Sequence, residues 1–402
     1  MAVIKIAEPR TAPPKGLAPF ALGFRPFFLL AGVAAVALIM LWMLIYEGLL
    51  PLPTYYNRGW YGNSWHAHEM VFGYSVAVLA GFLLTAARNW TDRPTITGTP
   101  LMLLALLWLA ARLLPFAPGV SFAVVALVDV LFLPLLALAL FIPIVRVKQW
   151  RNIVFPVLAL LMAGGNLMFH YELFGLMTGG VRLGLVLGIY IVLLLIVIMG
   201  GRVIPFFVER GAPGATTRSW PVVEGLSIAT LVALAMTELF HPDVVVIAAM
   251  AVVAAIVHGI RLAGWYSRLA MHVTLLWVLL LGYSWLVIGF VLLALAAPLE
   301  LPRSLAWHAF TVGAIGGLTL GMMARVALGH TGRLLQPHWL MGYAFALLNL
   351  AAFVRVIIAV LWPGHYELLV VIAAMLWCLG FALFIVIYTP ILMKPRVDGR
   401  PG

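Results

Sequence analysis

The sequence predicts an all-α fold: a polytopic membrane helical bundle of about twelve transmembrane helices, with both termini in the cytoplasm. Three observations predict it. Hydrophobic residues make up 65% of the chain and charged residues only 9%, and the mean hydropathy of +1.12 is too high for a water-soluble domain. Many apolar stretches are long enough to cross about 30 Å of hydrocarbon. The polar segments between them are too short for a separate soluble domain, so we expect any binding or catalytic site inside the bundle.

Hydropathy places each span in order along the chain. The first apolar run follows a basic, proline-rich start and is too long for the apolar part of a signal peptide, so we expect no cleaved leader. The third span is the shortest, and a tight LPFAPG linker joins it to the fourth. The twelve spans are expected at residues 24–48, 65–87, 99–115, 120–145, 152–175, 182–207, 220–240, 243–262, 270–297, 305–328, 338–361 and 367–392.

Lysine and arginine residues predict the orientation of the bundle. With the N-terminus inside, nineteen of them fall on the cytoplasmic side, four, including Arg112, fall outside, and Arg355 lies within a span. We therefore expect residues 1–23 to form a cytoplasmic N-terminal segment, residues 24–392 a single transmembrane bundle, and residues 393–402 a cytoplasmic tail.

The net charge and the cysteine content exclude several classes of protein. The net charge of +11 follows from the excess of lysine and arginine on the cytoplasmic side. We therefore expect contact with membrane lipid and no nucleic-acid partner. Cys378 is the single cysteine, which excludes an intrachain disulfide and a cysteine-ligated cluster. The sequence has no CxxCH motif for covalent haem attachment, so any haem would be of the non-covalent b type.

Histidines at the outer end of the second span are the first candidates for a site. Ionisable groups inside a membrane are expensive and therefore point to function, and imidazole is the commonest metal and haem ligand. His66 and His68 are two residues apart, about 200° around a helix, so they are not expected to bind one metal together. His66 and Met70 should share a helix face with Gly73. Glu69 is placed to orient a ligating imidazole or to move protons.

The tenth span offers another histidine at the same depth. His308 precedes a row formed by Gly313, Gly317 and Gly321, which would let another helix, or a flat porphyrin, approach closely. At an offset of 240 residues His68 falls on His308, so these two histidines could sandwich a b-type haem. His170, by contrast, is interpreted as an ordinary interfacial polar residue.

Five motifs occur in order along nearly the whole chain. They are GFRPFFLLAG (23–32), WHAHEMVFGY (65–74), GFLLTAARNWTDRP (81–94), GRVIPFF (201–207) and WHAFTVGAIGGLTLGMMARVALGHTGR (307–333). With these motifs the sequence resembles the NnrS family. That family is described as twelve-helix inner-membrane proteins that contain haem and copper and are associated with bacterial nitric oxide metabolism and resistance to nitrosative stress.

The resemblance implies haem b and copper as cofactors and a location in the bacterial cytoplasmic membrane. It implies nitric oxide as ligand or substrate, with electrons from quinol or a separate donor. Glu69 is the expected catalytic residue. The metal ligands are expected among His66, His68 and His308. The wider cofactor-binding set is expected to include His68, His308, His272, His330, Arg202 and Arg325.

Three other functions compete with reduction of nitric oxide. A haem-based binder or sensor would bind nitric oxide without turnover, and a dedicated entry site for an electron donor would argue against it. A twelve-helix transporter fits the number of spans, but transporters seldom place several histidines at one depth beside glycine rows. A structural assembly factor is disfavoured by the same buried histidines.

Overall fold

A computed structural model describes residues 16–56, 62–240 and 243–400. The described residues form helices and contain no β-strand, and twelve helices are long and apolar enough to cross a membrane. The predicted all-α membrane bundle is therefore confirmed. Most of the predicted N-terminal segment, residues 1–15, lies outside the described residues.

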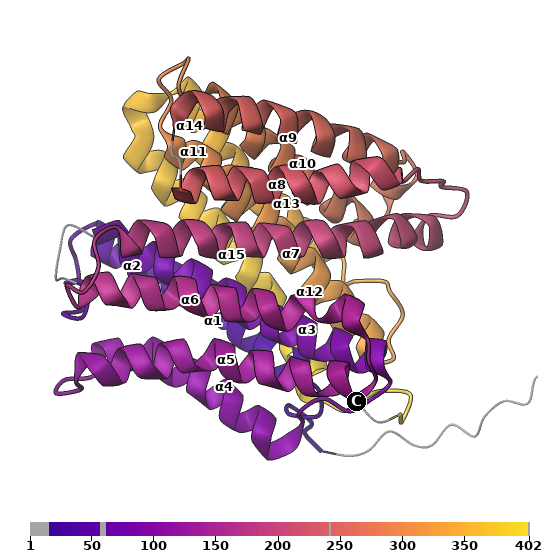
Figure 1. The fold of residues 1–402 in the computed structure, drawn as a ribbon. Helices are drawn as coiled ribbons and strands as arrows, with labels where there is room; N and C mark the ends of the chain where they lie inside the picture. Colours follow the sequence, from indigo (N-terminus) through magenta and orange to yellow (C-terminus); the bar gives the residue numbers. More distant parts are fainter. Residues whose placement is uncertain (1–15, 57–61, 241–242, 401–402) are drawn as a thin grey trace, which may run out of the picture.

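The helices follow one another with short connections (Figure 1). The first six spans consist of α1 (Phe24–Tyr46), α2 (Gly62–His68) with η1 (Glu69–Ser75) and α3 (Val76–Thr91), α4 (Gly98–Leu113) with η2 (Leu114–Phe116), α5 (Phe122–Arg146), η3 (Trp150–Asn152) with α6 (Val154–Leu173), and α7 (Gly180–Gly211). The other six consist of α8 (Pro221–Phe240), α9 (Val244–Trp265), α10 (Thr274–Leu295), α11 (Arg303–His308) with η5 (Ala309–Gly316) and α12 (Gly317–His330), α13 (Leu340–Ala352) with η6 (Phe353–Ile358) and α14 (Ala359–Leu361), and η7 (Pro363–His365) with α15 (Tyr366–Met393).

All twelve predicted spans correspond to observed ones, and the ends differ by a few residues. Helices α3 and α7 each run four residues past the predicted limits of 87 and 207. These extensions contain Arg88, Glu209 and Arg210. Hydropathy falls at such polar residues, whereas backbone hydrogen bonding continues into the interface. The sequence therefore underestimates the length of both helices.

Two spans form the centre of the bundle. In the most apolar part of each span, 83% of the residues of Asn63–Thr91 and 78% of those of Arg303–His330 are buried. A hydrogen bond of 2.6 Å between the hydroxyls of Tyr74 and Thr319 joins them. Helices α4 and α5 lie along one margin of the bundle, and α9 lies toward the opposite margin (Figure 1). The two spans that carry the predicted histidines are therefore the most enclosed.

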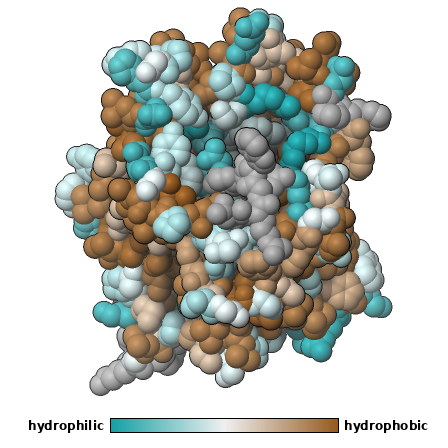
Figure 2. Space-filling model, turned by 90° about the vertical axis from the view of Figure 1, so that its left-hand side faces the viewer, coloured by the Kyte–Doolittle hydropathy of each residue, from teal (hydrophilic) through white to brown (hydrophobic). Residues whose placement is uncertain are grey.

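The end of the bundle that carries α2 and α11 is the predicted outer end. Figure 2 looks onto this end, where hydrophilic residues gather in the upper half of the face. An end of this kind suits contact with water and headgroups. The histidines of α2 and α11 therefore lie near a polar face of the bundle.

Three helical segments have π geometry: η1, η5 and η6. A π turn adds a residue to each turn of an α-helix. Such turns are rare in proteins overall, but they occur often at functional sites. Segment η1 begins directly after His68, η5 directly after His308, and η6 contains Arg355. Each π segment is therefore placed beside a titratable side chain inside a span.

The glycine row of the tenth span packs against α10. A Cβ atom added to Gly313 would collide with the ring of Trp285, and one added to Gly321 would lie 2.8 Å from Cγ1 of Val278. Cβ atoms essentially never come this close, so the glycines let two helices approach. Clearance for a flat porphyrin along this row is therefore excluded by the packing.

Candidate functional site

His66 and His68 face different environments, as their spacing predicts. His66 lines a cavity between the two central spans, whereas His68 is fully buried in a polar cluster on the other side of its helix. The cavity also receives His308. The structure thus brings His66 together with His308, and the expected sandwich between His68 and His308 is wrong.

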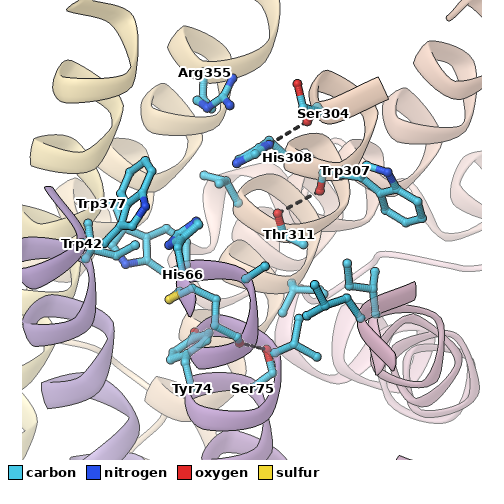
Figure 3. Close-up of a pocket in the computed structure, with 18 of the residues that line it drawn as sticks. Trp42, His66, Tyr74, Ser75, Ser304, Trp307, His308, Thr311, Arg355 and Trp377 are labelled. Atoms are coloured by element: carbon cyan, nitrogen blue, oxygen red, sulfur yellow. Dashed lines mark hydrogen bonds between the residues drawn. The ribbon is translucent and has the colours of Figure 1, made fainter. Parts of the chain in front are cut away.

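The cavity has a volume of about 350 Å³ and a mainly apolar lining. Its walls come from α1, the second span, α7, the tenth span, η6 and α15. Trp42 and Trp377 contribute aromatic walls, and His66, His308 and Arg355 are grouped around the same space (Figure 3). An apolar cavity of this size with a few convergent polar groups is typical of a small-molecule or cofactor site.

The hydrogen bonds of His308 leave one ring nitrogen for a ligand. Nδ1 of His308 donates to the carbonyl oxygen of Ser304 at 2.6 Å. Because a carbonyl oxygen only accepts, the neutral ring carries its proton on Nδ1 and has its lone pair on Nε2. No hydrogen bond within the described part of the chain engages Nε2. His66 stacks on the ring of Trp42, with centroids 4.3 Å apart, which fixes the plane of its imidazole.

Arg355 brings a positive charge to the same cavity. Its side chain is 7% exposed, and Nη2 donates to the hydroxyl of Tyr366 at 2.6 Å. Nη1 is buried without a hydrogen-bond partner, and no ion pair to Arg355 is found among the described residues. A buried guanidinium without an acid favours an anionic group, since arginine binds carboxylates through two parallel hydrogen bonds.

The π geometry of η1 changes which residues face the cavity. Met70 lines it together with His66, as predicted, but Gly73 does not. Tyr74 and Ser75 line the cavity in its place. The extra residue in the π turn shifts the lining face, so the prediction for Gly73 is wrong, and its carbonyl oxygen accepts from Nε1 of Trp108 on α4 instead.

His68 belongs to a buried polar cluster built from three helices. Its Nε2 lies 2.9 Å from Oδ1 of Asn166 and 3.1 Å from Oδ2 of Asp129. Nε2 of His170 lies 3.0 Å from the same Asp129 oxygen. One atom from each of His68, Asp129 and His170 lies within 4.8 Å of the others, a spacing that suits a metal ion. The interpretation of His170 as an interfacial residue is therefore wrong, because it is buried in this cluster.

Glu69 and Arg112 complete the cluster. Oε2 of Glu69 accepts from Nη1 of Arg112 at 2.8 Å, and Oε1 lies 3.2 Å from Nδ1 of His68. Arg112 also forms an ion pair with Asp129. The contact with His68 is the orienting contact expected of Glu69, while delivery of protons by Glu69 stays a prediction.

The sequence contained a signal for part of this cluster. Asp129 is the only acidic residue in the apolar run from 122 to 145, and an isolated acid in a span is a functional candidate. Arg112 is predicted only as an outer positive charge. Asn166 carries no charge, so the same argument does not single it out.

The residues expected near the cytoplasmic face do not form one site. His272 is exposed on η4. Arg202 donates to Oδ1 of Asn152 at 3.0 Å, and the Arg325 guanidinium lies 3.8 Å from the centre of the Phe207 ring. No hydrogen bond or ring contact joins His272, Arg202 or Arg325 to one another in the described ranges. A cofactor role for them stays a prediction that the geometry does not support.

His330 lies at the end of α12, where the C-terminal tail docks. Its ring is 5.9 Å from that of Phe24, and its carbonyl oxygen accepts from Nη1 of Arg396 at 3.0 Å. The backbone N–H of Val397 donates to the carbonyl oxygen of Thr331 at 3.1 Å. The HTGR motif at this position therefore holds the tail against the bundle, and a ligand role for His330 stays a prediction.

Comparison with protein families gives a match over nearly the whole chain. A family model described as NnrS protein matches residues 18–396. No curated protein matches the chain. The matched region includes all twelve spans, the cavity and the buried cluster.

Proposed function

Because the chain belongs to the NnrS family, we propose that it binds haem b between His66 and His308 and removes nitric oxide there by reduction. Family membership and the twelve spans indicate a multi-pass membrane protein connected with nitric oxide. The observation that carries the finer proposal is the cavity in which two imidazoles meet an arginine that has no ion pair among the described residues. We place the protein in the bacterial cytoplasmic membrane, as the family implies.

The residues around the cavity fit a haem. His66 and His308 offer imidazole nitrogens, the ligands that hold haem iron in many proteins. Nη1 of Arg355 is buried without a partner, and a haem propionate would supply the carboxylate that it lacks. The aromatic and aliphatic lining suits a porphyrin face. When bound, haem would supply a redox-active iron, which nitric oxide would reach by displacing one of the two imidazoles.

The protein side chains set the conditions for this chemistry. Ser304 holds the tautomer of His308 through its carbonyl oxygen, so Nε2 faces a ligand without rotation. The apolar walls exclude water while admitting nitric oxide, which is small and apolar and concentrates in bilayers. Arg355 stabilises negative charge in the cavity. His308 directly precedes η5 and Arg355 lies within η6, and π segments are often found at functional sites.

Reduction joins two molecules of nitric oxide, two electrons and two protons to give nitrous oxide and water. The electrons are proposed to come from quinol or a separate donor protein. Glu69 is proposed to take part in proton supply through its contacts with His68 and Tyr56. Copper is the second metal that the family implies, and the buried cluster offers donor atoms for it outside the cavity.

Consumption of nitric oxide by the purified protein tests this proposal. The full chain in detergent is mixed with a reduced quinol, and nitric oxide is followed with an electrode. We expect consumption that stops in His308→Ala and in His66→Ala and continues in His338→Ala, a change at an exposed histidine. Binding of nitric oxide by the wild type without consumption under any donor would contradict reduction and favour the sensor function.

A further inference from the structure

We propose that Arg88 and Arg333 bind the phosphate group of an anionic lipid at the end of the bundle opposite α2. Helices α3, α12 and α15 all end there (Figure 1), and the sequence predicts that this end faces the cytoplasm. The proposal does not depend on haem or on nitric oxide. It is carried by a group of arginines, by a buried guanidinium nitrogen without a partner, and by exposed apolar side chains beside them.

Four arginines from separate segments lie together around the end of α12. Arg396 in the tail donates from Nη1 to the carbonyl oxygen of His330 at 3.0 Å, and its charge acts on both His330 and Arg25. Arg88, near the end of α3, also acts on His330. Arg333, three residues past α12, also acts on Arg25. The four positive charges are therefore near enough to repel one another.

Two of these arginines are already held by groups of the chain. Arg25 is buried, and its Nη1 donates to the carbonyl oxygen of Leu392 at 3.0 Å and to that of Lys394 at 2.5 Å. Arg396 donates from Nε to Oδ1 of Asp398 at 2.8 Å. These contacts fix the end of α15 and the tail, and they make a rigid positive wall for a ligand.

The other two arginines have no such groups. Arg88 and Arg333 are half-buried, and within the described part of the chain neither guanidinium forms a hydrogen bond or an ion pair. Nη1 of Arg333 is buried without a hydrogen-bond partner. A donor removed from water without an acceptor is unfavourable, and the planar fork of arginine matches two oxygens of a phosphate group. An anion between these two side chains would supply the missing acceptors.

The charge at this end also favours an anion. Four arginines stand against one carboxylate in contact with them, that of Asp398. Asp92 is exposed and forms no ion pair with any of them in the described ranges. Each of the three helix C-termini contributes about half a negative charge, so with neutral His330 a positive charge of roughly one to two remains. The single negative charge of a phosphodiester matches this remainder.

Apolar side chains beside the arginines favour a lipid over a free phosphate ion. Leu334 and Leu335 follow Arg333 directly, and Val397 follows Arg396; all three apolar side chains are exposed. Trp339, also exposed, lies just before α13, and tryptophan is enriched at the level of lipid headgroups. A lipid would cover these side chains with its glycerol and acyl groups, whereas a phosphate ion would leave them in water.

The general excess of positive charge at this end gives the alternative explanation. Arginines of that kind attract anionic lipid diffusely and extend into water. Arg210 and Arg268 fit this description, because both are exposed. Arg88 and Arg333 differ from them in being half-buried beside other arginines. The two pairs therefore separate a built site from diffuse attraction.

The experiment measures lipid binding to the full chain in detergent by native mass spectrometry. Phosphatidylglycerol, phosphatidylcholine and inorganic phosphate are titrated separately. We expect one tight site for phosphatidylglycerol, weakened about fivefold or more in the double variant Arg88→Gln with Arg333→Gln, since one basic contact with an anionic lipid contributes about that factor. Neither guanidinium is bonded to a described part of the chain, so we expect this variant to fold. Arg210→Gln with Arg268→Gln is the matched control and should keep the site.

Each other result overturns the proposal. Equal binding of the two lipids, or unchanged phosphatidylglycerol binding in the double variant, would show that the arginines form no phosphate site. An equal loss in the control pair would show diffuse attraction only. Inorganic phosphate that binds as tightly as phosphatidylglycerol would overturn the assignment to a lipid.

Proteolysis of the wild type gives a test that needs no variant. Lys394 and Arg400 precede prolines, where trypsin cuts poorly, so cleavage of the tail after Arg396 can be followed by release of the peptide that begins at Val397. We expect phosphatidylglycerol to slow this cleavage relative to phosphatidylcholine, because a bound phosphate reduces the repulsion between the tail and the other arginines. Equal rates in the two lipids would contradict the proposal.

Discussion

Removing the guanidinium of Arg112 should destabilise the protein far more than removing that of an exposed arginine. Arg112 bridges Glu69 and Asp129 in the cluster, and all three side chains are buried. Arg112→Met keeps a long apolar side chain but leaves two carboxylates without their counter-charge. Breaking a buried pair by removing one partner costs about 3–5 kcal/mol, and we expect a loss in that range.

Arg268 provides the control. Its side chain is exposed, and no ion pair to it is found among the described residues. Surface substitutions away from such contacts usually change stability by about 0.5 kcal/mol or less, so Arg268→Met should lower the free energy of unfolding by no more than about that amount. Both variants replace an arginine with methionine and are compared in the same detergent.

The assay is equilibrium unfolding in mixed detergent micelles, followed by circular dichroism. A triple variant adds Glu69→Gln and Asp129→Asn to Arg112→Met and should recover part of the loss, because neutral amides need no counter-charge. Equal effects of Arg112→Met and Arg268→Met, or no recovery in the triple variant, would refute the view that the cluster is a buried ionic network.

Three further predictions concern the cavity, the helix mouth and the tail. Arg355→Met should lower haem content while Arg355→Lys retains more of it, since only lysine keeps a charge near the propionates; pyridine haemochrome spectra measure this. Glu69→Gln should keep haem but lower nitric oxide consumption by roughly 10²-fold or more, the effect of a lost acid–base group; unchanged consumption would remove Glu69 from proton supply. Arg396 lowers the pKa of Asp398 to about 2, so their contribution to tail docking is complete above the usual carboxyl range and is lost as the pH falls through about 2. Arg396→Gln should move this loss to higher pH, as measured by proteolysis of the tail with an acid-stable protease.

The spans could be predicted from the sequence because each depends on local composition. About 20 apolar residues are needed to cross the membrane, and every predicted run of this kind is a helix in the structure. The opposite placement of His66 and His68 also followed from local geometry. The π turn after His68 could not be predicted in this way. Because of this turn, Tyr74 rather than Gly73 lines the cavity.

The candidate sites depend on contacts between distant segments. Asp129 and Arg112 are 17 residues apart on neighbouring helices, and His68 and Asn166 are 98 residues apart. Hydropathy and motif spacing describe one helix at a time, so they could nominate these residues singly but not as a cluster. The same limit explains why the docking of the tail on His330 was missed, since Arg396 lies 66 residues away.

The central claim is that His66 and His308 hold a b-type haem that nitric oxide reaches. Its most direct test is the absorption spectrum of the reduced full chain before and after addition of nitric oxide. We predict a b-type spectrum that shifts on addition in the wild type, and loss of that spectrum in the double variant His66→Ala with His308→Ala, while Asp129→Asn keeps it. Full haem content with an unchanged spectrum and an unchanged nitric oxide response in the double variant would contradict the claim.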